Sequence, residues 1–315
     1  MGNKKKVLLM GKSGAGKTSM RSIIFANYVA RDTRRLGPTM NVEHSYIRFL
    51  GTMVLNLWDC GGQPNYFDNY ITPQREQIFK GAEVLIFVIS VETKELQDDL
   101  RLYQSCLEAL AHLSPEAKIV CLISKMDLIA DEKREQEFSV RESEIKRRSL
   151  PLKVTCYPTS IWDESLYKAW SSIIYSLVPN IAKFESSLNM FADIMRADEV
   201  LLFEKATYLI IAHSVRRKHP DGHRFEKISN IIKQFKLNAS RYVANLHTMR
   251  MEIINGDLKI LLDMLTPNTA IMVVITDPLV YPAAISLNIQ TARKHFEMLE
   301  KLDRAPAMQF GDPKV

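Results

Sequence analysis

The sequence predicts an α/β fold in two parts: a mostly parallel, doubly wound sheet in residues 1–180, then a smaller α+β domain in residues 181–303. Strand and helix patterns alternate along the first part. Two of its strands, residues 84–91 and 119–124, are continuous apolar runs, as in strands covered by helices on both faces. After Pro179 the order changes to neighbouring strands flanked by helices. With 315 residues, each part is long enough to bury its own core.

The first part should begin with a short buried strand at residues 6–10 and an amphipathic helix at residues 17–30. Side chains then alternate through residues 42–49 and 53–58 with a glycine turn between them, which predicts an antiparallel hairpin. The remaining pattern is typical of parallel strands covered by helices. These elements are strands at 84–91, 119–124 and 154–157 and helices at 99–112, 131–148 and 165–177.

The second part has the pattern of a mostly antiparallel sheet with flanking helices. A long helix is expected at residues 224–247, with a bend near Leu237. The other expected elements are helices at 181–196 and 283–302 and strands at 200–203, 208–213, 259–265 and 270–276. Residues 304–315 are short, polar and rich in proline, so we expect a frayed end there.

Composition excludes several classes of protein. No segment approaches the roughly 20 unbroken apolar residues that a membrane span needs. The apolar run at residues 7–10 is too short for the core of a signal peptide. The cysteines are widely spaced without a C-x-x-C pair, which favours buried free thiols in a reducing compartment, the cytosol or the nucleus. They are Cys60, Cys106, Cys121 and Cys156.

Net charge and the N-terminus bear on possible partners. A net charge of +6 would suit nucleic acid or an anionic membrane, but the basic residues mostly alternate with acidic ones, which favours solvated helix faces and no nucleic acid. Residues 213–224 are more basic and are either a contact for an acidic partner or a charged loop. Gly2 invites myristoylation, but Lys6 stands where that motif needs Ser or Thr. A lipid at Gly2 is therefore not expected.

A phosphate-binding loop is predicted at Gly11–Thr18, which matches G-x-x-x-x-G-K-[ST] between an expected strand and an expected helix. Its glycines let successive N–H groups face phosphate oxygens, and the helix adds the positive end of its dipole. Lys17 should reach the β- and γ-phosphates, and Thr18 should coordinate Mg²⁺. A glycine-rich turn without function would not need this pattern in this context. The predicted nucleotide-binding residues here are Ser13, Gly14, Ala15, Gly16, Lys17, Thr18 and Ser19.

Asp59, Gly62 and Gln63 form a second motif, directly after the strand that ends at Trp58. Asp59 would bind Mg²⁺, and the N–H of Gly62 would approach the γ-phosphate. Gln63 would orient the attacking water for in-line hydrolysis and is the predicted catalytic residue. In register after a phosphate loop, this motif indicates a Ras-like GTPase.

The third motif indicates guanine. Asp127 can accept hydrogen bonds from guanine N1 and the exocyclic amine, which adenine cannot offer, and the stem of Lys125 can cover the base. Ser124 stands where Asn is usual, which removes an amide that ties this loop together. Ser160 and Ile161 follow the last strand, where the backbone of such a loop contacts the guanine oxygen.

The segment between the first helix and the hairpin should contain a switch. Thr39 is the best candidate for a second protein ligand of Mg²⁺, and Thr33 is either beside the nucleotide or on the plain surface. Arg34 and Arg35 raise the alternative of a charge-stabilising arginine supplied in cis, although a solvated basic turn is the preferred interpretation.

On these motifs the sequence resembles the Rag small GTPases, and within them the RagA/RagB-like subunit, over nearly the whole chain. The resemblance is strongest in residues 20–28, 57–63, 159–164 and 225–237. The last stretch matters most, because ordinary Ras-like proteins have no second domain. The RagA-like pattern also lacks Asn in the guanine motif, with His at the position of Ser124, so this departure weakens the guanine prediction only slightly.

The resemblance implies a Ras-like GTPase domain at residues 1–180 that uses GTP/GDP and Mg²⁺ and hydrolyses GTP slowly without a GAP. It also implies a roadblock-like domain at residues 181–303, which pairs with a RagC/RagD-like partner in an obligate heterodimer. Such dimers sit on the lysosomal or vacuolar surface through a Ragulator-type scaffold. In the GTP state they recruit the TOR kinase complex when amino acids are plentiful, and a GATOR-type GAP ends that state.

Two other classes of function compete with the switch. A metabolic P-loop kinase would need a phosphate-acceptor site and a lid with arginines, and the sequence indicates neither. A nucleotide-binding scaffold without useful turnover would act through dimerisation by residues 180–315 alone. The switch is the preferred interpretation, because Asp59, Gln63 and Asp127 follow the phosphate loop in register.

Overall fold

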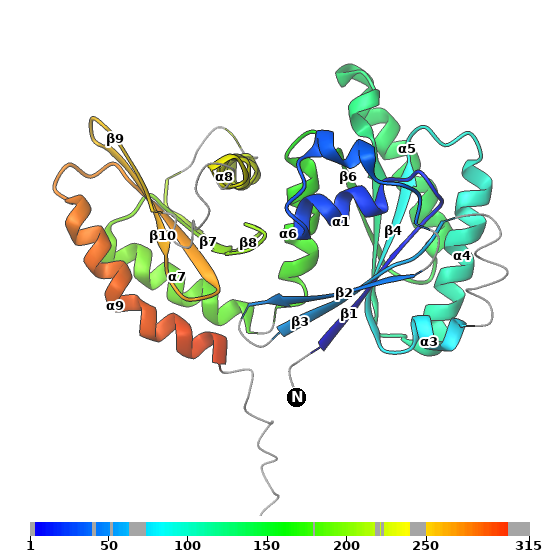
Figure 1. Cartoon of the computed structure of the whole chain (residues 1–315), viewed down its shortest axis with the longest axis horizontal. Coiled ribbons are helices and arrows are strands. Elements are labelled where there is room, and N and C mark those ends of the chain that lie inside the picture. The colour runs from blue at the N-terminus through cyan, green and yellow to red at the C-terminus, as the bar shows by residue number, and fades with distance from the viewer. Residues whose placement is uncertain are drawn as a thin grey trace, which may run out of the picture.

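The computed structural model describes residues 4–39, 42–50, 53–62, 74–178, 180–217, 221, 224–239 and 250–301. In this part of the chain two β-sheets lie beside one another, each with helices against both faces (Figure 1). The strand order of the first sheet is β2-β3-β1-β4-β5-β6, and that of the second is β8-β7-β11-β10-β9. The α/β fold class predicted from the sequence is confirmed.

The first sheet is parallel except for its β2–β3 hairpin, as predicted. Its central strands are apolar on both faces, because alternate residues of each strand enter two different cores. Leu9 and Ile86 pack with one set of helices, whereas Leu8 and Phe87 pack with the other. The strands are β1 (Lys4–Met10), β2 (Glu43–Phe49), β3 (Met53–Asp59), β4 (Ala82–Ser90), β5 (Lys118–Ser124) and β6 (Val154–Pro158).

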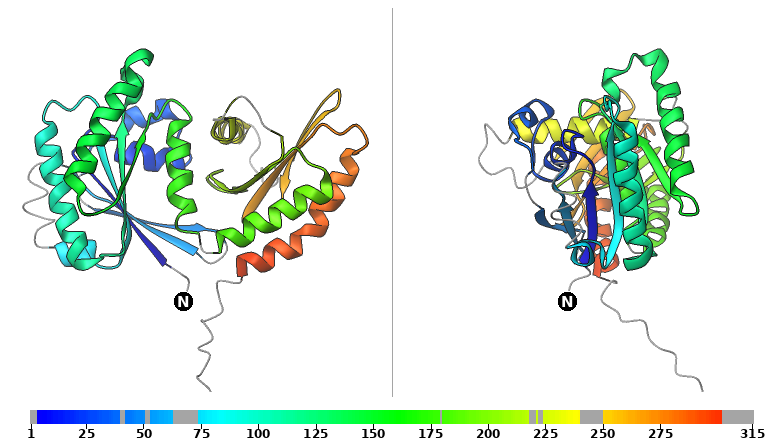
Figure 2. Two further views of the ribbon diagram at one scale, coloured as in Figure 1. Left: turned by 180° about the vertical axis from the view of Figure 1, so that it is seen from behind. Right: turned by 90° about the vertical axis from the view of Figure 1, so that its right-hand side faces the viewer.

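Two groups of helices cover this sheet (Figures 1 and 2). One face carries α1 (Lys17–Phe25) and α6 (Ser165–Tyr175). The other carries α3 (Arg75–Phe79), α4 (Leu96–Leu113) and α5 (Asp131–Ser149). The short helix α3 was not predicted from the sequence. This arrangement brings the carboxyl ends of the parallel strands to one edge of the sheet, where ligands bind in such folds.

Helix α1 ends earlier than the sequence suggests, at Phe25 rather than near residue 30. Asn27 takes a left-handed φ of 59°, and the N–H groups of Ala26 and Tyr28 both bond to the carbonyl of Ser22. These contacts close the last turn, so apolar spacing beyond it no longer reflects a helix. A 3₁₀ helix, η1 (Ala30–Arg35), follows.

The second sheet is antiparallel throughout its described pairs. Val200 and Leu202 face α7 and α9, whereas Leu201 and Phe203 face α8. The bounds are α7 (Ile181–Met195), β7 (Glu199–Glu204), β8 (Ile210–Val215), α8 (Arg224–Ala239), β9 (Met251–Asn255), β10 (Leu258–Met264), β11 (Thr269–Ile275) and α9 (Pro282–Lys301).

Strand β9 is absent from the sequence prediction, since Met-Glu-Ile-Ile-Asn shows no alternation and the strand is largely exposed. The predicted helix at 224–247 is described as far as Ala239, and residues 240–249 lie outside the described residues. The predicted frayed segment 304–315 also lies outside them. All four cysteines are buried and free, as predicted.

The two sheets are joined through α6. The ring of Trp170 meets that of Phe25 edge-on, with centroids 5.0 Å apart, on the side of α1. On its other side α6 packs against β8, where the backbone N–H of Ile210 donates to Ser171 Oγ at 3.3 Å. One apolar cluster therefore continues from the α1 face of the first sheet to the α7 and α9 face of the second. Among the described helices, none has the length and apolar character needed to cross a membrane.

Candidate functional site

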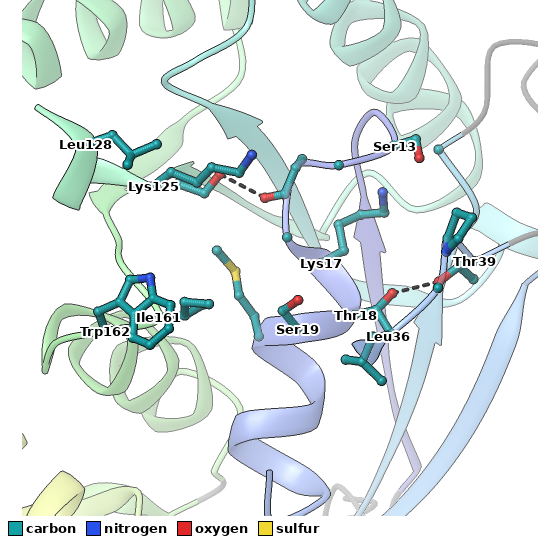
Figure 3. A pocket seen from close by; sticks show the side chains of 18 of the residues that line it. Ser13, Lys17, Thr18, Ser19, Leu36, Thr39, Lys125, Leu128, Ile161 and Trp162 are labelled. Atoms are coloured by element: carbon teal, nitrogen blue, oxygen red, sulfur yellow. Dashed lines mark hydrogen bonds between the residues drawn. The ribbon is translucent and has the colours of Figure 1, made fainter. Parts of the chain in front are cut away.

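A cavity of about 420 Å³ lies at the carboxyl ends of β1 and β5 (Figure 3). Predicted nucleotide-binding residues make up most of its lining: Ser13, Gly14, Ala15, Gly16, Lys17, Thr18, Ser19, Thr39, Gly62, Ser124, Lys125, Asp127 and Ile161. Residues that were not predicted to bind nucleotide complete it: Met20, Leu36, Gly37, Pro38, Leu128 and Trp162. The pocket thus brings together motifs that are far apart in the chain.

The loop after β1 has the backbone of a phosphate cradle. Gly14 and Gly16 take φ values of 79° and 92°, a region that favours glycine. Gly16 caps helix α1, so the N-terminal N–H groups of that helix face the cavity. Lys17 Nζ donates to the carbonyls of Gly11 at 2.7 Å and Lys12 at 2.9 Å. Burial lowers the pKa of Lys17, against the influence of the nearby Asp59 carboxylate.

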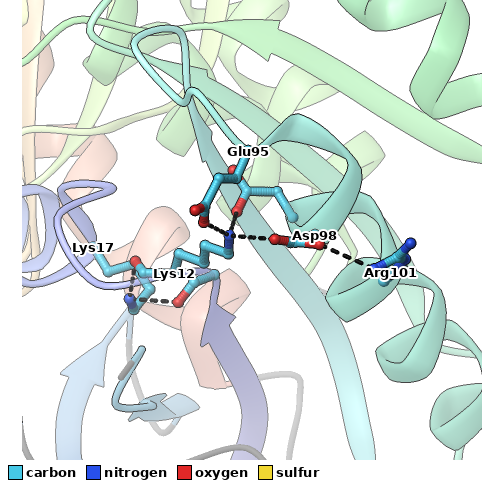
Figure 4. A network of polar contacts seen from close by, with 7 residues as sticks. Lys12, Lys17, Glu95, Asp98 and Arg101 are labelled. Carbon is cyan, nitrogen blue, oxygen red and sulfur yellow. Dashed lines mark hydrogen bonds and ion pairs between the residues drawn. The ribbon is translucent and has the colours of Figure 1, made fainter. Parts of the chain in front are cut away.

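Lys12 fastens this loop to the start of α4 (Figure 4). Its Nζ lies 3.0 Å from Glu95 Oε2 and 3.3 Å from Asp99 Oδ1, with Asp98 Oδ2 at 3.9 Å. Asp99 is buried, so its pairing with Lys12 offsets the cost of removing a carboxylate from water. This ion pair was not predicted from the sequence, because its partners are more than 80 residues apart.

The predicted metal ligands fit a magnesium ion. Thr18 and Thr39 approach within 2.7 Å at their Oγ1 atoms, close to the roughly 2.9 Å between neighbouring ligands in an octahedral Mg²⁺ site. Asp59 is 0% exposed, and no hydrogen bond of good geometry reaches either carboxylate oxygen from the described residues, although the Thr18 hydroxyl lies close by. Arg21 Nε lies 3.1 Å from Asp59 Oδ2, and burial raises the pKa of Asp59, which the Thr18 hydroxyl acts to lower. A carboxylate in this condition suits a cation or its bound water.

Gly62 lies directly on the phosphate loop, with its carbonyl accepting a hydrogen bond from the N–H of Ser13 at 2.7 Å. A Cβ at position 62 would stand 2.3 Å from Ser13 N and 2.4 Å from the Lys12 carbonyl carbon. Only glycine therefore allows this close approach. Gln63, the predicted catalytic residue, lies outside the described residues.

Two serines make hydrogen bonds at the end of the cavity that is predicted to bind the base. Ser124 Oγ donates to the carbonyl of Ala15 at 2.8 Å, so the serine ties the third motif to the phosphate loop despite the missing amide. Ser160 Oγ donates to Asp127 Oδ1 at 2.7 Å, which orients that carboxylate. Lys125 takes a left-handed φ of 62°, and its Nζ pairs with Glu92 Oε2 at 2.8 Å.

Two predicted residues, Ser160 and Thr33, do not line the cavity, and Arg34, raised only as an alternative, contacts Trp162. Ser160 is buried behind Asp127 and does not line the cavity. Thr33 is not among the described lining residues either, because its hydroxyl turns into η1 and donates to the carbonyl of Ala30 at 2.7 Å. The Arg34 guanidinium carbon lies 5.4 Å from the ring centroid of Trp162. Figure 3 shows Trp162 on the side of the cavity away from Ser13 and Thr39. This cation–π contact accounts for Arg34 without a role at the phosphates.

Comparisons with known proteins agree with this geometry. The model of the Gtr1/RagA G protein conserved region matches residues 6–232. Ras-related GTP-binding protein A of Dictyostelium discoideum is 57% identical, over 93% of this chain and 97% of that protein. Ras-related GTP-binding protein B of Rattus norvegicus is 53% identical, over 95% and 87%. Ras-related GTP-binding protein C of Homo sapiens is 27% identical, over 67% and 53%. The chain therefore belongs to the Gtr1/RagA family of G proteins.

Proposed function

We propose that this GTPase is a guanine-nucleotide switch that acts as the RagA/B-like half of a heterodimer and signals amino-acid sufficiency to the TOR kinase complex. Residues 1–180 would be the GTPase domain and residues 181–303 the roadblock-like dimerisation domain. The 2.7 Å contact between Thr18 and Thr39 carries the switch proposal, because it joins the phosphate loop to the segment that precedes β2. A ligand bound between these residues would hold that segment in place.

The chain's residues have distinct tasks in the proposed reaction. Lys17 and the N–H groups of the phosphate loop would hold the β- and γ-phosphates, and Asp127 would hold the base. Mg²⁺, bound near Thr18, Thr39 and Asp59, would neutralise charge on the phosphates. Gln63 would orient the attacking water. Loss of the γ-phosphate would then release Thr39, which provides the conformational signal.

Purification of the protein tests directly whether it binds a guanine nucleotide. We expect the full chain, co-expressed with a RagC/D-like subunit, to carry stoichiometric GDP or GTP, and single-turnover hydrolysis to release phosphate from GTP. Chromatography of the nucleotide extracted after denaturation measures this. A protein that carries no guanine nucleotide, or prefers ATP in competition, would overturn the proposal and favour the kinase.

The exposed edge of the second sheet supports heterodimer formation. Strand β9 pairs with β10 on one side and is the end of the described sheet on the other. Its successive residues Ile253 and Ile254 point to opposite faces and are 48% and 57% exposed. An edge strand with apolar side chains on both faces is suited to pairing with another chain. We infer that β9 contributes to the contact with the RagC/D-like subunit.

A lysine at this edge should block the pairing. Ile253→Lys adds a charge that would be buried against the partner, and we expect at least about a tenfold loss of affinity for the RagC/D-like subunit. Leu279→Lys is the matched control, since Leu279 is also exposed and apolar but lies before α9. Pull-down titration measures both variants. Equal binding by Ile253→Lys and wild type would remove β9 from the interface.

The cellular role is proposed from the family. The heterodimer would lie in the cytoplasm at the lysosomal or vacuolar surface, held there by a Ragulator-type scaffold, with a further population in the nucleus. A GATOR-type GAP would promote hydrolysis by this subunit. A scaffold without useful turnover is the competing function, and TOR signalling that is indifferent to Gln63→Leu would favour it.

A further inference from the structure

Lys233 is a buried lysine that joins the second sheet's helix to the nucleotide-binding part. It lies on α8 and is 1% exposed. Its Nζ donates to the carbonyls of Ile23 and Ile24, each at 2.5 Å, across more than 200 residues of sequence. Both carbonyls belong to the last turn of α1, where backbone oxygens lack partners within the helix. Lys233 therefore caps α1 from another part of the fold.

The surroundings of Lys233 make this contact specific. Burying an amine is costly unless it is hydrogen-bonded, and the negative end of a helix dipole favours a cation. Burial lowers the pKa of Lys233 to about 7, while Glu204 acts to raise it and Lys236 to lower it further. Glu204 is engaged in its own turn, accepting from the N–H and hydroxyl of Thr207. The carbonyls of α1 are thus the hydrogen-bonding partners that the described structure gives Lys233.

Helix α1 connects this contact to the cavity. It begins at Lys17, and Ile24 lies about 9 Å beyond Thr18 along the axis at 1.5 Å per residue. Met20 and Ile23 are packed in the core, so the helix cannot bend freely between its ends. A shift of its C-terminal end must therefore move its N-terminal end, from which the phosphate loop extends.

The other contacts between the two parts do not fix α1 in the same way. Ile210 bonds to Ser171 on α6, and α6 in turn reaches α1 through the edge-on rings of Trp170 and Phe25, an apolar contact within the first part of the chain. Apolar surfaces slide more easily than a pair of directed hydrogen bonds. We propose that Lys233 is a positioning residue for nucleotide binding, holding α1 and its phosphate loop in place from the second part of the chain.

Lys233→Met tests the proposal by keeping the length of the side chain and removing its donors. We expect GDP to dissociate about fivefold faster or more from this variant, as for a typical coupling between sites. Lys236→Met is the matched control, because it makes the same change one turn along α8, where the contacts of Lys236 Nζ with described residues are the Lys205 carbonyl at 3.4 Å and the face of Tyr208. Its dissociation rate should change less than about twofold.

Stopped-flow release of a fluorescent GDP analogue from the purified heterodimer provides the rates. Unfolding midpoints measured without nucleotide separate a general loss of stability from a change in nucleotide binding. Equal rates for Lys233→Met and wild type would overturn the proposal. The proposed switch function depends on which nucleotide is bound and not on Lys233, so equal dissociation rates would leave that proposal intact.

Wild-type protein supplies a second test if Lys233→Met does not fold. Hydrogen exchange is compared between GDP-bound and nucleotide-free protein. Removing GDP should raise exchange at the end of α1 and in the turn of α8 around Lys233 together. If exchange rises in α1 while α8 keeps its protection, the two elements are not coupled and the proposal is wrong.

Discussion

Replacing Asp127 by asparagine is expected to change the base that the pocket accepts. Guanine offers two donors, N1–H and the exocyclic amine, to the carboxylate, whereas xanthine carries a carbonyl in place of that amine. The amide N–H groups of an asparagine would face the amine of guanine, which is also a donor. In xanthine they would face the carbonyl, which accepts their hydrogen bonds. We expect GDP affinity to fall by about a thousandfold or more, because the site would then hold an unpaired polar group, and xanthosine diphosphate to bind in its place.

The hydrogen bond from Ser160 determines which atom of an asparagine at position 127 would face the base. Ser160 Oγ donates to Asp127 Oδ1, so an asparagine should keep its carbonyl on Ser160 and turn its amide toward the base. Asp131→Asn is the control, since it makes the same substitution at a side chain that is 84% exposed. Competition between GDP and xanthosine diphosphate against a fluorescent nucleotide measures the change. If Asp127→Asn still prefers GDP, the carboxylate does not read the base.

Elements whose structure is determined by local chemistry could be predicted from the sequence. The apolar runs of β4 and β5 follow from burial on both faces, and the glycines of the phosphate loop follow from backbone angles that other residues rarely adopt. Strand β9 could not be predicted in this way, because Ile253 and Ile254 are consecutive and exposed on opposite faces. A strand that is exposed on both faces lacks the alternation of buried and exposed residues by which a strand is predicted.

Contacts between residues that are far apart in the chain could not be predicted from the sequence. Ser124 differs from the usual asparagine, which suggests a looser loop, but its hydroxyl finds the carbonyl of Ala15 at a separation of 109 residues. Lys12 Nζ likewise donates to Oε2 of Glu95, a residue far from it in the sequence. Trp162 lines the pocket from the segment between β6 and α6, a position that the spacing of the motifs does not indicate. Such pairings depend on tertiary packing rather than on spacing.

Replacing Gly62 by alanine is expected to slow GTP hydrolysis by about a hundredfold, the cost of a displacement near 1 Å at a reacting group. The new Cβ would stand 2.3 Å from Ser13 N, 2.4 Å from the Lys12 carbonyl carbon and 2.6 Å from the Gly11 oxygen. These are backbone atoms of the phosphate loop, which cannot turn aside as a flexible side chain would. The chain at position 62 must therefore move, and Gln63 is covalently attached to it.

Gly37→Ala is the control for this experiment, because Gly37 also lines the cavity but a Cβ there would meet no atom within 4 Å. Single-turnover phosphate release gives the hydrolysis rate, and displacement of a fluorescent nucleotide gives the affinity separately. A Gly62→Ala protein that hydrolyses GTP within threefold of wild type would show that the contact between Gly62 and the Ser13 N–H is not kept during the reaction. A slow variant that still binds GTP would locate the loss in the placement of Gln63, since the ligand itself would remain in the pocket.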